Sequence, residues 1–281
     1  LNAINRKPSK IPINNIITKI KNTGFTGTNI DLVYGLPLQT VEGFNNTLKK
    51  AIELDVDRIA VFSYAHVPSV IPRQKILEKF TFPSAEEKAL MYNNAYNVFK
   101  DFGYQPIGMD HFAKPSDELS IALKNKELHR NFQGYCTLKT TGQVYGFGAS
   151  SISQLHSSYS QNEKNAAKYI KFIENNKFAT FRGYNLNRNE KVIRKIINEI
   201  MCNYYVDLAK VAQEFNTKIE EIIKLTSFRE DRFNDFIEDE ILEISNNKIK
   251  ISTKGRIVIR NIAMRFDPLM IKNTKSYSKT I

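Results

Sequence analysis

One acid–histidine pair in the chain has residue types suited to proton transfer or ligand binding. Asp110 and His111 follow Gly108 and a short extended segment, so we expect the pair to face a pocket rather than a core. The sequence leaves the alternative equally open, namely a structural histidine that takes no part in chemistry.

A second polar segment surrounds Arg130. Arg130 stands next to His129, with Asn131 and Gln133 close behind, and this group of donors suits a carboxylate or an amide-rich ligand. A solvated edge strand explains the same residues equally well. The segment is therefore a candidate site for which both interpretations stay open.

Two other features are weaker indications of binding. Gly146, Phe147 and Gly148 follow a strand-like segment, but the third glycine of a dinucleotide fingerprint is absent. Cys136 and Cys202 have no further Cys or His nearby at metal-ligand spacing. Both cysteines are therefore predicted to be small buried hydrophobic residues.

The chain carries a large excess of positive charge. It has 41 Lys and Arg against 29 Asp and Glu, a net charge of +12, which favours nucleic acid, phospholipid surfaces or a multiply carboxylated small molecule. Four basic residues near the C-terminus follow a predicted hairpin, as in a winged helix: Lys254, Arg256, Arg260 and Arg265. A nucleic-acid-binding module is therefore one alternative, although such charge is commonly a solvated helix face.

The elements that would position these residues begin as alternating strands and helices. Short β-branched segments predict strands at 29–34 and 58–64, Thr40 is expected to cap one helix, and Ser84 with Glu87 a second. This alternation predicts parallel pairing, with functional residues at the carboxyl ends of the strands. Shorter strands are predicted at 104–109, 132–138 and 144–147.

The second half of the chain has a different pattern. From about Gln161 isoleucines recur at helical spacing, which predicts a helical second domain. Asn246 and Asn247 predict the turn of a hairpin over 241–251, and a last helix is predicted at 255–265.

The composition of the 281 residues is that of a globular protein, with 42% hydrophobic and 25% charged residues. No apolar run reaches the roughly 18 residues of a membrane span. Neither a secretory signal nor a disulfide framework is present, which favours the cytoplasm.

Four motifs resemble those of the oxygen-independent coproporphyrinogen III oxidases, radical S-adenosylmethionine enzymes of haem synthesis. They are NIDLVYGLPLQT at 29–40, FSYAHVP at 62–68, IGMDHFA at 107–113 and LHRNFQGY at 128–135. The resemblance continues through 201–203 and 253–256 and covers nearly all of the chain. Haem chaperones of the same superfamily generally differ at 108–113, so the oxidase is favoured and the chaperone is the alternative.

The resemblance implies an α/β fold. Residues 1–172 would be the back part of a partial radical-SAM (β/α)6 barrel with its covering segments, and 173–281 a mainly α-helical lid domain. The implied cofactors are S-adenosylmethionine and a [4Fe-4S] cluster, and the implied substrate is coproporphyrinogen III. An electron donor, an electron acceptor and a monomeric parent protein without a nucleic-acid partner are implied as well.

The resemblance also implies roles for individual residues. Four match cofactor-contacting positions: Arg6, Asp31 and Ala65 for a second S-adenosylmethionine, and Ile152 for the first. Five are substrate-side candidates: Phe132, Gln133, Asp110, His111 and Arg130. Asp31 is expected at a strand end, where its carboxylate can hold a cationic or hydroxyl group, and Ala65 is expected to leave space for a flat ligand.

The chain lacks the Cys-x-x-x-Cys-x-x-Cys loop that binds the cluster in this family. The part of the family's sequence that this chain resembles starts just before the fifth barrel strand. We therefore expect the chain to be a C-terminal fragment of its parent protein, without cluster or activity of its own. In the family reaction a 5′-deoxyadenosyl radical removes hydrogen from the propionate β-carbon. Loss of CO₂ and an electron then leaves a vinyl group.

Overall fold

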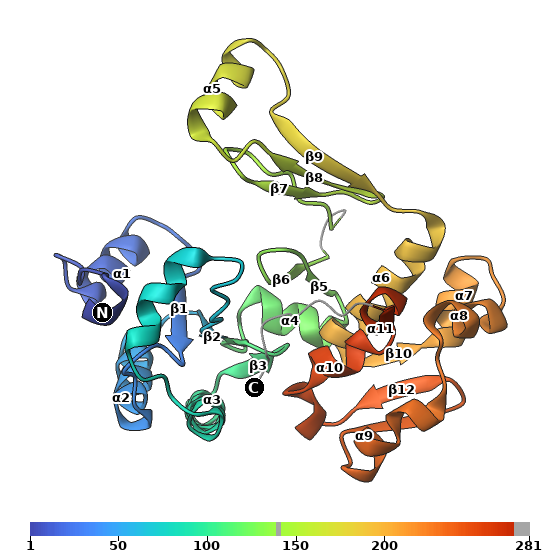
Figure 1. Ribbon diagram of the computed structural model, residues 1–281. Helices are drawn as coiled ribbons and strands as arrows, with labels where there is room; N and C mark the ends of the chain where they lie inside the picture. Colours follow the sequence, from blue (N-terminus) through green and yellow to red (C-terminus); the bar gives the residue numbers. More distant parts are fainter. Residues whose placement is uncertain (139–141, 273–281) are drawn as a thin grey trace. The chain divides into compact units, whose positions relative to one another are not determined.

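The computed structural model describes residues 1–138 and 142–272 (Figure 1). Contacts divide it into two compact units, an N-terminal unit built on Leu1–Ile121 and a C-terminal unit of Ala122–Asn273. The predicted boundary after residue 172 falls within α5 (Ala166–Glu174) of the C-terminal unit. The assignment of a barrel part and a lid domain stays a prediction.

The N-terminal unit contains a four-stranded mixed sheet with the order β1-β2-β4-β3. β1 (Asn29–Tyr34) and β2 (Arg58–Ser63) are parallel. β4 (His111–Ala113) runs antiparallel to β2 and to β3 (Gln105–Ile107). The predicted parallel pairing of the first two strands is confirmed, and the described residues form mixed sheets with no closed barrel.

Helices pack on one face of this sheet. α1 (Ile13–Asn22), α2 (Val41–Glu53) and α3 (Ala85–Asp101) share a hydrophobic core with Tyr34, Ile59 and other strand residues. Strand positions that alternate with the core residues point to the other face: Asp31, Ala60 and His111. Two 3₁₀ helices, η1 (Asn2–Ile4) and η2 (Pro72–Lys79), complete the unit, and α4 (Glu118–Asn125) spans the division between the units.

The two predicted helix caps are confirmed. Gly43 N donates to Thr40 Oγ1 at 3.1 Å at the start of α2. At the start of α3, Glu87 N donates to Ser84 Oγ at 3.1 Å, and Ser84 N donates to Glu87 Oε2 at 2.8 Å. These bonds satisfy backbone N–H groups that the first helical turn leaves without partners.

The C-terminal unit contains three small sheets and a series of helices. Its strands are β5 (Leu128–Arg130) with β6 (Tyr135–Thr137), β7 (Ile152–Gln154) with β8 (Ser158–Asn162) and β9 (Thr180–Asn185), and β10 (Tyr205–Asp207) with β12 (Lys248–Ile251) and β11 (Leu242–Ser245). Its further helices are α6 (Arg188–Asn203), α7 (Leu208–Glu214), α8 (Ile219–Thr226), η3 (Glu230–Phe233), α9 (Asn234–Glu238), η4 (Lys254–Arg256), α10 (Ile259–Met264) and α11 (Pro268–Lys272).

Two sequence predictions in this unit need correction. The predicted change to helices at Gln161 is too early, because β8 continues past it and β9 follows α5. All residues of β9 are exposed, so β9 lacks the alternating hydrophobicity by which a sequence reveals a strand. The strand predicted at 144–147 is reduced to one bridge, between Val144 and Gln154, and Gly148 leaves the extended conformation with a φ of 100°.

The predicted hairpin over 241–251 is confirmed. β11 and β12 are antiparallel, and Asn246 and Asn247 between them have φ values of 50° and 59°, as a type I′ turn requires. The helix predicted at 255–265 is present as two pieces, η4 and α10.

Gly255 is a position where the fold has no room for a side chain. A Cβ there would overlap the carbonyl oxygen of Ile241 and lie 2.8 Å from Cγ2 of Ile251. We expect Gly255→Ala to lower the free energy of unfolding by about 1–3 kcal/mol, the usual cost of overpacking, in urea denaturation. Gly27→Ala is the control, because no atom lies within 4 Å of that Cβ position, and equal stability of both variants would contradict this packing.

Candidate functional site

Asp31 and His111 lie on the face of the N-terminal sheet opposite the helix-packed core. Asp31 is paired with Ala60 on β2, and Ala60 is paired with His111 on β4, so two strand spacings, about 10 Å, separate the two positions. Asp31 is exposed, and Asn29 Nδ2 donates to its Oδ1 at 2.8 Å. The expectation of a strand-end position is wrong, since Asp31 is the third of the six residues of β1.

Asp110 and His111 form a close pair. His111 Nδ1 lies 2.6 Å from Asp110 Oδ1. The His111 side chain is 11% exposed, and the Asp110 side chain is 17% exposed. The His111 ring meets Phe62 edge-on, with 5.9 Å between ring centroids. Val61 N donates to the Asp110 carbonyl oxygen at 2.7 Å, which fixes the pair to β2. The substrate-side role of the pair stays a prediction, beside the structural one.

The carboxyl ends of β1 and β2 meet next to Asp110. Burial raises the pKa of Tyr34, the last residue of β1, to about 12; a hydrogen bond with Ser63 opposes this shift, and the charge of Asp110 adds to it. The Tyr34 phenol is therefore neutral at physiological pH. It contributes a polar but uncharged group to this edge of the sheet.

Ala65 and Arg6 are both exposed residues of the N-terminal unit. Ala65 follows β2 in a turn fixed by Gln74, whose Nε2 donates to the Ala65 carbonyl oxygen at 3.0 Å and whose Oε1 accepts from Val67 N at 2.7 Å.

Ile152, the fourth cofactor candidate, belongs to the C-terminal unit. It is the first residue of β7, is partly buried, and pairs with Gln161 on β8. The candidates for the two cofactor molecules therefore lie in different units of the chain.

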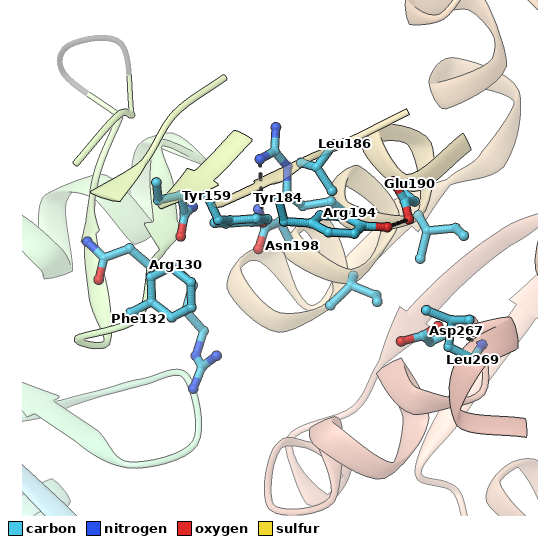
Figure 2. A pocket seen from close by; sticks show the side chains of 14 residues that line it. Arg130, Phe132, Tyr159, Tyr184, Leu186, Glu190, Arg194, Asn198, Asp267 and Leu269 are labelled. Carbon is cyan, nitrogen blue, oxygen red and sulfur yellow. Dashed lines mark hydrogen bonds between the residues drawn. The ribbon is translucent and has the colours of Figure 1, made fainter. Parts of the chain in front are cut away.

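A pocket of about 690 Å³ lies within the C-terminal unit (Figure 2). We call it the α6 pocket, because one stripe of α6 forms a wall of it. The stripe has helical spacing and consists of Glu190, Ile193, Arg194, Ile197 and Asn198. The other lining residues are Arg130, Asn131, Phe132, Gln154, Tyr159, Tyr184, Leu186, Asp267 and Leu269.

Tyr159 and Arg194 organise one part of this pocket. The Phe132 and Tyr159 rings meet edge-to-face, with centroids 5.4 Å apart. Arg194 donates to the Leu155 and His156 carbonyl oxygens at 3.3 and 2.5 Å and to Tyr159 Oη at 3.4 Å. Figure 2 shows Phe132, Tyr159 and Arg194 grouped at the same part of the pocket. The guanidinium of Arg194 is thus a positive charge held in place through its two terminal nitrogens.

Arg130 differs from Arg194 in this respect. Its guanidinium lies 5.7 Å from the centroid of the Tyr135 ring, and its Nε is buried without an acceptor among the described residues. Burial lowers the pKa of the neighbouring His129, and the charges of Arg194 and Lys195 lower it further. The pocket lining itself carries two guanidiniums, Arg130 and Arg194, and two carboxylates, Glu190 and Asp267.

Two of the five substrate-side candidates, Arg130 and Phe132, line the α6 pocket. Gln133 is exposed outside this lining, in a turn where its N–H donates to Asn131 Oδ1 at 2.8 Å. Asp110 and His111 belong to the other unit.

Tyr159, Tyr184 and Arg194 are among the residues of the α6 pocket that were not predicted from the sequence. Tyr184 donates to Glu190, which also accepts from Asn187 N at 2.8 Å in the capping box of α6. The sequence does contain one indication of this pocket wall. Ile193 and Ile197 form a second apolar stripe on α6 beside the buried Val192 and Ile196.

The cysteines do not form a cluster site. Cys202 is 1% exposed, and burial raises the pKa of its thiol to about 12. Cys136 is partly buried and accepts from Asn131 Nδ2 at 3.5 Å. Across 1–138 and 142–272, no group of three or more His, Cys, Asp or Glu side chains could hold a metal ion. These residues therefore do not fit a [4Fe-4S] cluster, which several thiolates must ligate.

Three of the four basic residues near the C-terminus have partners within the chain. Lys254 Nζ lies 2.6 Å from Glu240 Oε2, Arg265 Nη2 lies 2.5 Å from Asp235 Oδ2, and the Arg256 guanidinium lies 4.1 Å from the centroid of the Tyr204 ring. Arg260 is exposed.

Within the part of the chain that the structure describes, no helix has both the length and the apolar character to cross a membrane.

No protein-family model matches the chain. Among individual proteins, it is 38% identical over 266 residues to the oxygen-independent coproporphyrinogen III oxidase of Salmonella typhimurium, in a match that covers 94% of this chain and 57% of that protein. It is 37% identical over 283 residues to the enzyme of the same name from Thermostichus vulcanus, covering 99% of this chain and 85% of that one.

The structural comparison agrees with these relatives. The coproporphyrinogen III oxidase of Escherichia coli, described as a radical SAM enzyme, matches with a TM-score of 0.85 and 34% identity, over 95% of this chain and 61% of the other. The chain thus spans little more than half the length of the Salmonella relative but most of the Thermostichus one. On this similarity, the chain belongs to the family of oxygen-independent coproporphyrinogen III oxidases.

Proposed function

We propose that the protein to which this chain belongs converts coproporphyrinogen III to protoporphyrinogen IX in haem biosynthesis, by oxidative decarboxylation without oxygen. The observation that carries this proposal is the 37% identity to the Thermostichus vulcanus oxidase, which spans 99% of this chain and 85% of that protein. The TM-score of 0.85 to a radical SAM enzyme supports the same chemistry.

Arg6, Asp31 and Ala65 would hold the second S-adenosylmethionine. Arg6 would pair with the carboxylate of the cofactor, Asp31 would accept hydrogen bonds from an ammonium or hydroxyl group, and Ala65 would face a flat ring. When bound with the cluster, S-adenosylmethionine supplies the radical that removes hydrogen from the propionate side chain. Ile152 would contact the first S-adenosylmethionine molecule.

Five residues would serve the substrate: Phe132, Gln133, Asp110, His111 and Arg130. Coproporphyrinogen III carries four carboxylates, and the net charge of +12 suits such an anion. The electron donor, the electron acceptor, the monomeric state and the cytoplasmic location are parts of the same proposal.

The two alternatives are less well supported. A nucleic-acid-binding tail would need free cations, whereas Lys254 and Arg265 have carboxylate partners and Arg256 packs on Tyr204. A haem chaperone is disfavoured because the named relatives of this chain are oxidases. Tight haem retention without porphyrinogen turnover would nevertheless favour the haem chaperone over the oxidase.

Complementation tests the proposed reaction. The 281-residue chain would be co-expressed with the N-terminal portion of a longer relative that carries the cysteine loop, and protoporphyrinogen would be assayed anaerobically. The control replaces this chain by the matching portion of that relative. Product in both samples supports the proposal, whereas product in the control alone would contradict it.

We predict that the 281-residue chain alone binds no stoichiometric iron–sulfur cluster and forms no vinyl product. It has two cysteines, and the thiol of Cys202 is buried and protonated. The measurement is iron counting after anaerobic reconstitution with iron and sulfide, together with the product assay. The Cys136→Ser/Cys202→Ser double variant is the control. Stoichiometric iron in the wild-type chain, together with its loss in this variant, would show the prediction to be wrong.

We predict that Asp31→Asn weakens binding of S-adenosylmethionine to this chain roughly tenfold or more, because a hydrogen bond to a charged group loses its charge. Isothermal titration calorimetry measures the dissociation constant without any turnover. Glu42→Gln, which neutralises an exposed carboxylate on α2, is the matched control and should leave it unchanged. Equal affinities for wild type and Asp31→Asn would remove Asp31 from the cofactor site.

A further inference from the structure

We propose that the α6 pocket binds one carboxylate-bearing pyrrole ring of the tetrapyrrole, with Arg130 as the partner of the carboxylate. This inference rests on the proposed function, which supplies the class of substrate. It goes beyond that function by naming the cavity, the anchoring cation and the walls that receive the ring.

Arg130 is the pocket-lining arginine whose contact within the chain is an aromatic ring, that of Tyr135, rather than a hydrogen-bond acceptor. The two carboxylates of the lining are occupied, since Glu190 accepts from Tyr184 and from Asn187 N, and Asp267 Oδ1 accepts from Leu269 N at 2.9 Å. The two terminal nitrogens of Arg194 donate to acceptors within the chain. By contrast, Arg130 Nε is buried without an acceptor among the described residues, and a buried unpaired donor is costly. The Arg130 side chain as a whole is only partly buried and lines the pocket, so a ligand carboxylate would pair with its guanidinium.

Arg194 assists without being a direct ligand. Its guanidinium is held by the 155–156 backbone and by Tyr159, so its positive charge stays in place when the pocket is empty. Burial lowers the pKa of the nearby His129, and the charge of Arg194 lowers it further. A positive charge held in place attracts an anion before any contact forms.

The walls of the pocket suit a flat, partly apolar ring. Phe132 and Tyr159 present aromatic surface, and Ile193 and Ile197 present aliphatic surface from α6. Small-molecule sites usually have volumes of about 300–1,000 Å³ and a few polar groups on apolar walls. The α6 pocket, at about 690 Å³, meets both conditions.

The test uses the 281-residue chain and coproporphyrin III, the fluorescent oxidised form of the substrate with the same four carboxylates. Fluorescence titration should show that Arg130→Met, which keeps an unbranched apolar stem, weakens binding roughly tenfold or more. Arg182→Met is the matched control, because Arg182 is an exposed arginine of β9 outside the pocket lining, and it should bind as wild type does.

Two further arms separate loss of the carboxylate contact from loss of folding. Asn198→Asp adds a negative charge to the α6 wall without changing its size, and it should weaken binding several-fold. Coproporphyrin III tetramethyl ester has no carboxylate, so Arg130→Met should leave its affinity unchanged. Thermal unfolding of each variant shows whether the fold is intact.

Several results would overturn the inference. They are unchanged affinity of Arg130→Met and Asn198→Asp, an equal effect of Arg130→Met on acid and ester, or no binding of coproporphyrin III to the wild-type chain. None of these results decides the proposed function, because anaerobic complementation measures turnover independently. If the complemented protein forms product while the α6 pocket variants bind coproporphyrin III normally, the proposed function stands and the assignment of the pocket is wrong.

Discussion

The parallel pairing of β1 with β2 is the constraint on which the N-terminal unit depends. Six consecutive residue pairs fix its register. A slip by one residue would turn Asp31 into the core and Tyr34 out of it, and an ionised carboxylate in that core would be strongly destabilising. The register therefore keeps Asp31 on the sheet face opposite the helices, where the pairing of β4 with β2 also places His111, and leaves the other face to hydrophobic packing.

The elements that the sequence predicted well are those specified by local chemistry. Thr40, Ser84 and Glu87 cap their helices because their side chains reach backbone N–H groups within the same turn. Asn246 and Asn247 form the hairpin because they tolerate positive φ. β9 escaped prediction because both of its faces are exposed, and a strand without a buried face has no hydrophobic alternation.

The candidate site was predictable in its residue types but not in its geometry. The sequence identified Arg130 and the Asp110–His111 pair, yet only the fold shows that the pair is nearly buried and that Arg130 Nε lacks an internal acceptor in the described ranges. Arg194 was missed because its acceptors lie about forty residues away, at 155–156. Long-range partners of this kind depend on tertiary packing, which periodicity does not reveal.

Hydrogen–deuterium exchange of the 281-residue chain, with and without S-adenosylmethionine and coproporphyrin III, tests the account most directly. Asp31 and Ala65, the candidates for the second S-adenosylmethionine, lie in the N-terminal unit, whereas the α6 pocket lies in the C-terminal unit, so S-adenosylmethionine should slow exchange at 29–35 and 63–67. Coproporphyrin III should slow exchange at 128–133 and along α6. Two results would contradict the assignment of cofactor and substrate sites. One is slowed exchange confined to 254–265, and the other is unchanged exchange at 29–35, 63–67, 128–133 and α6 when both ligands are at saturation.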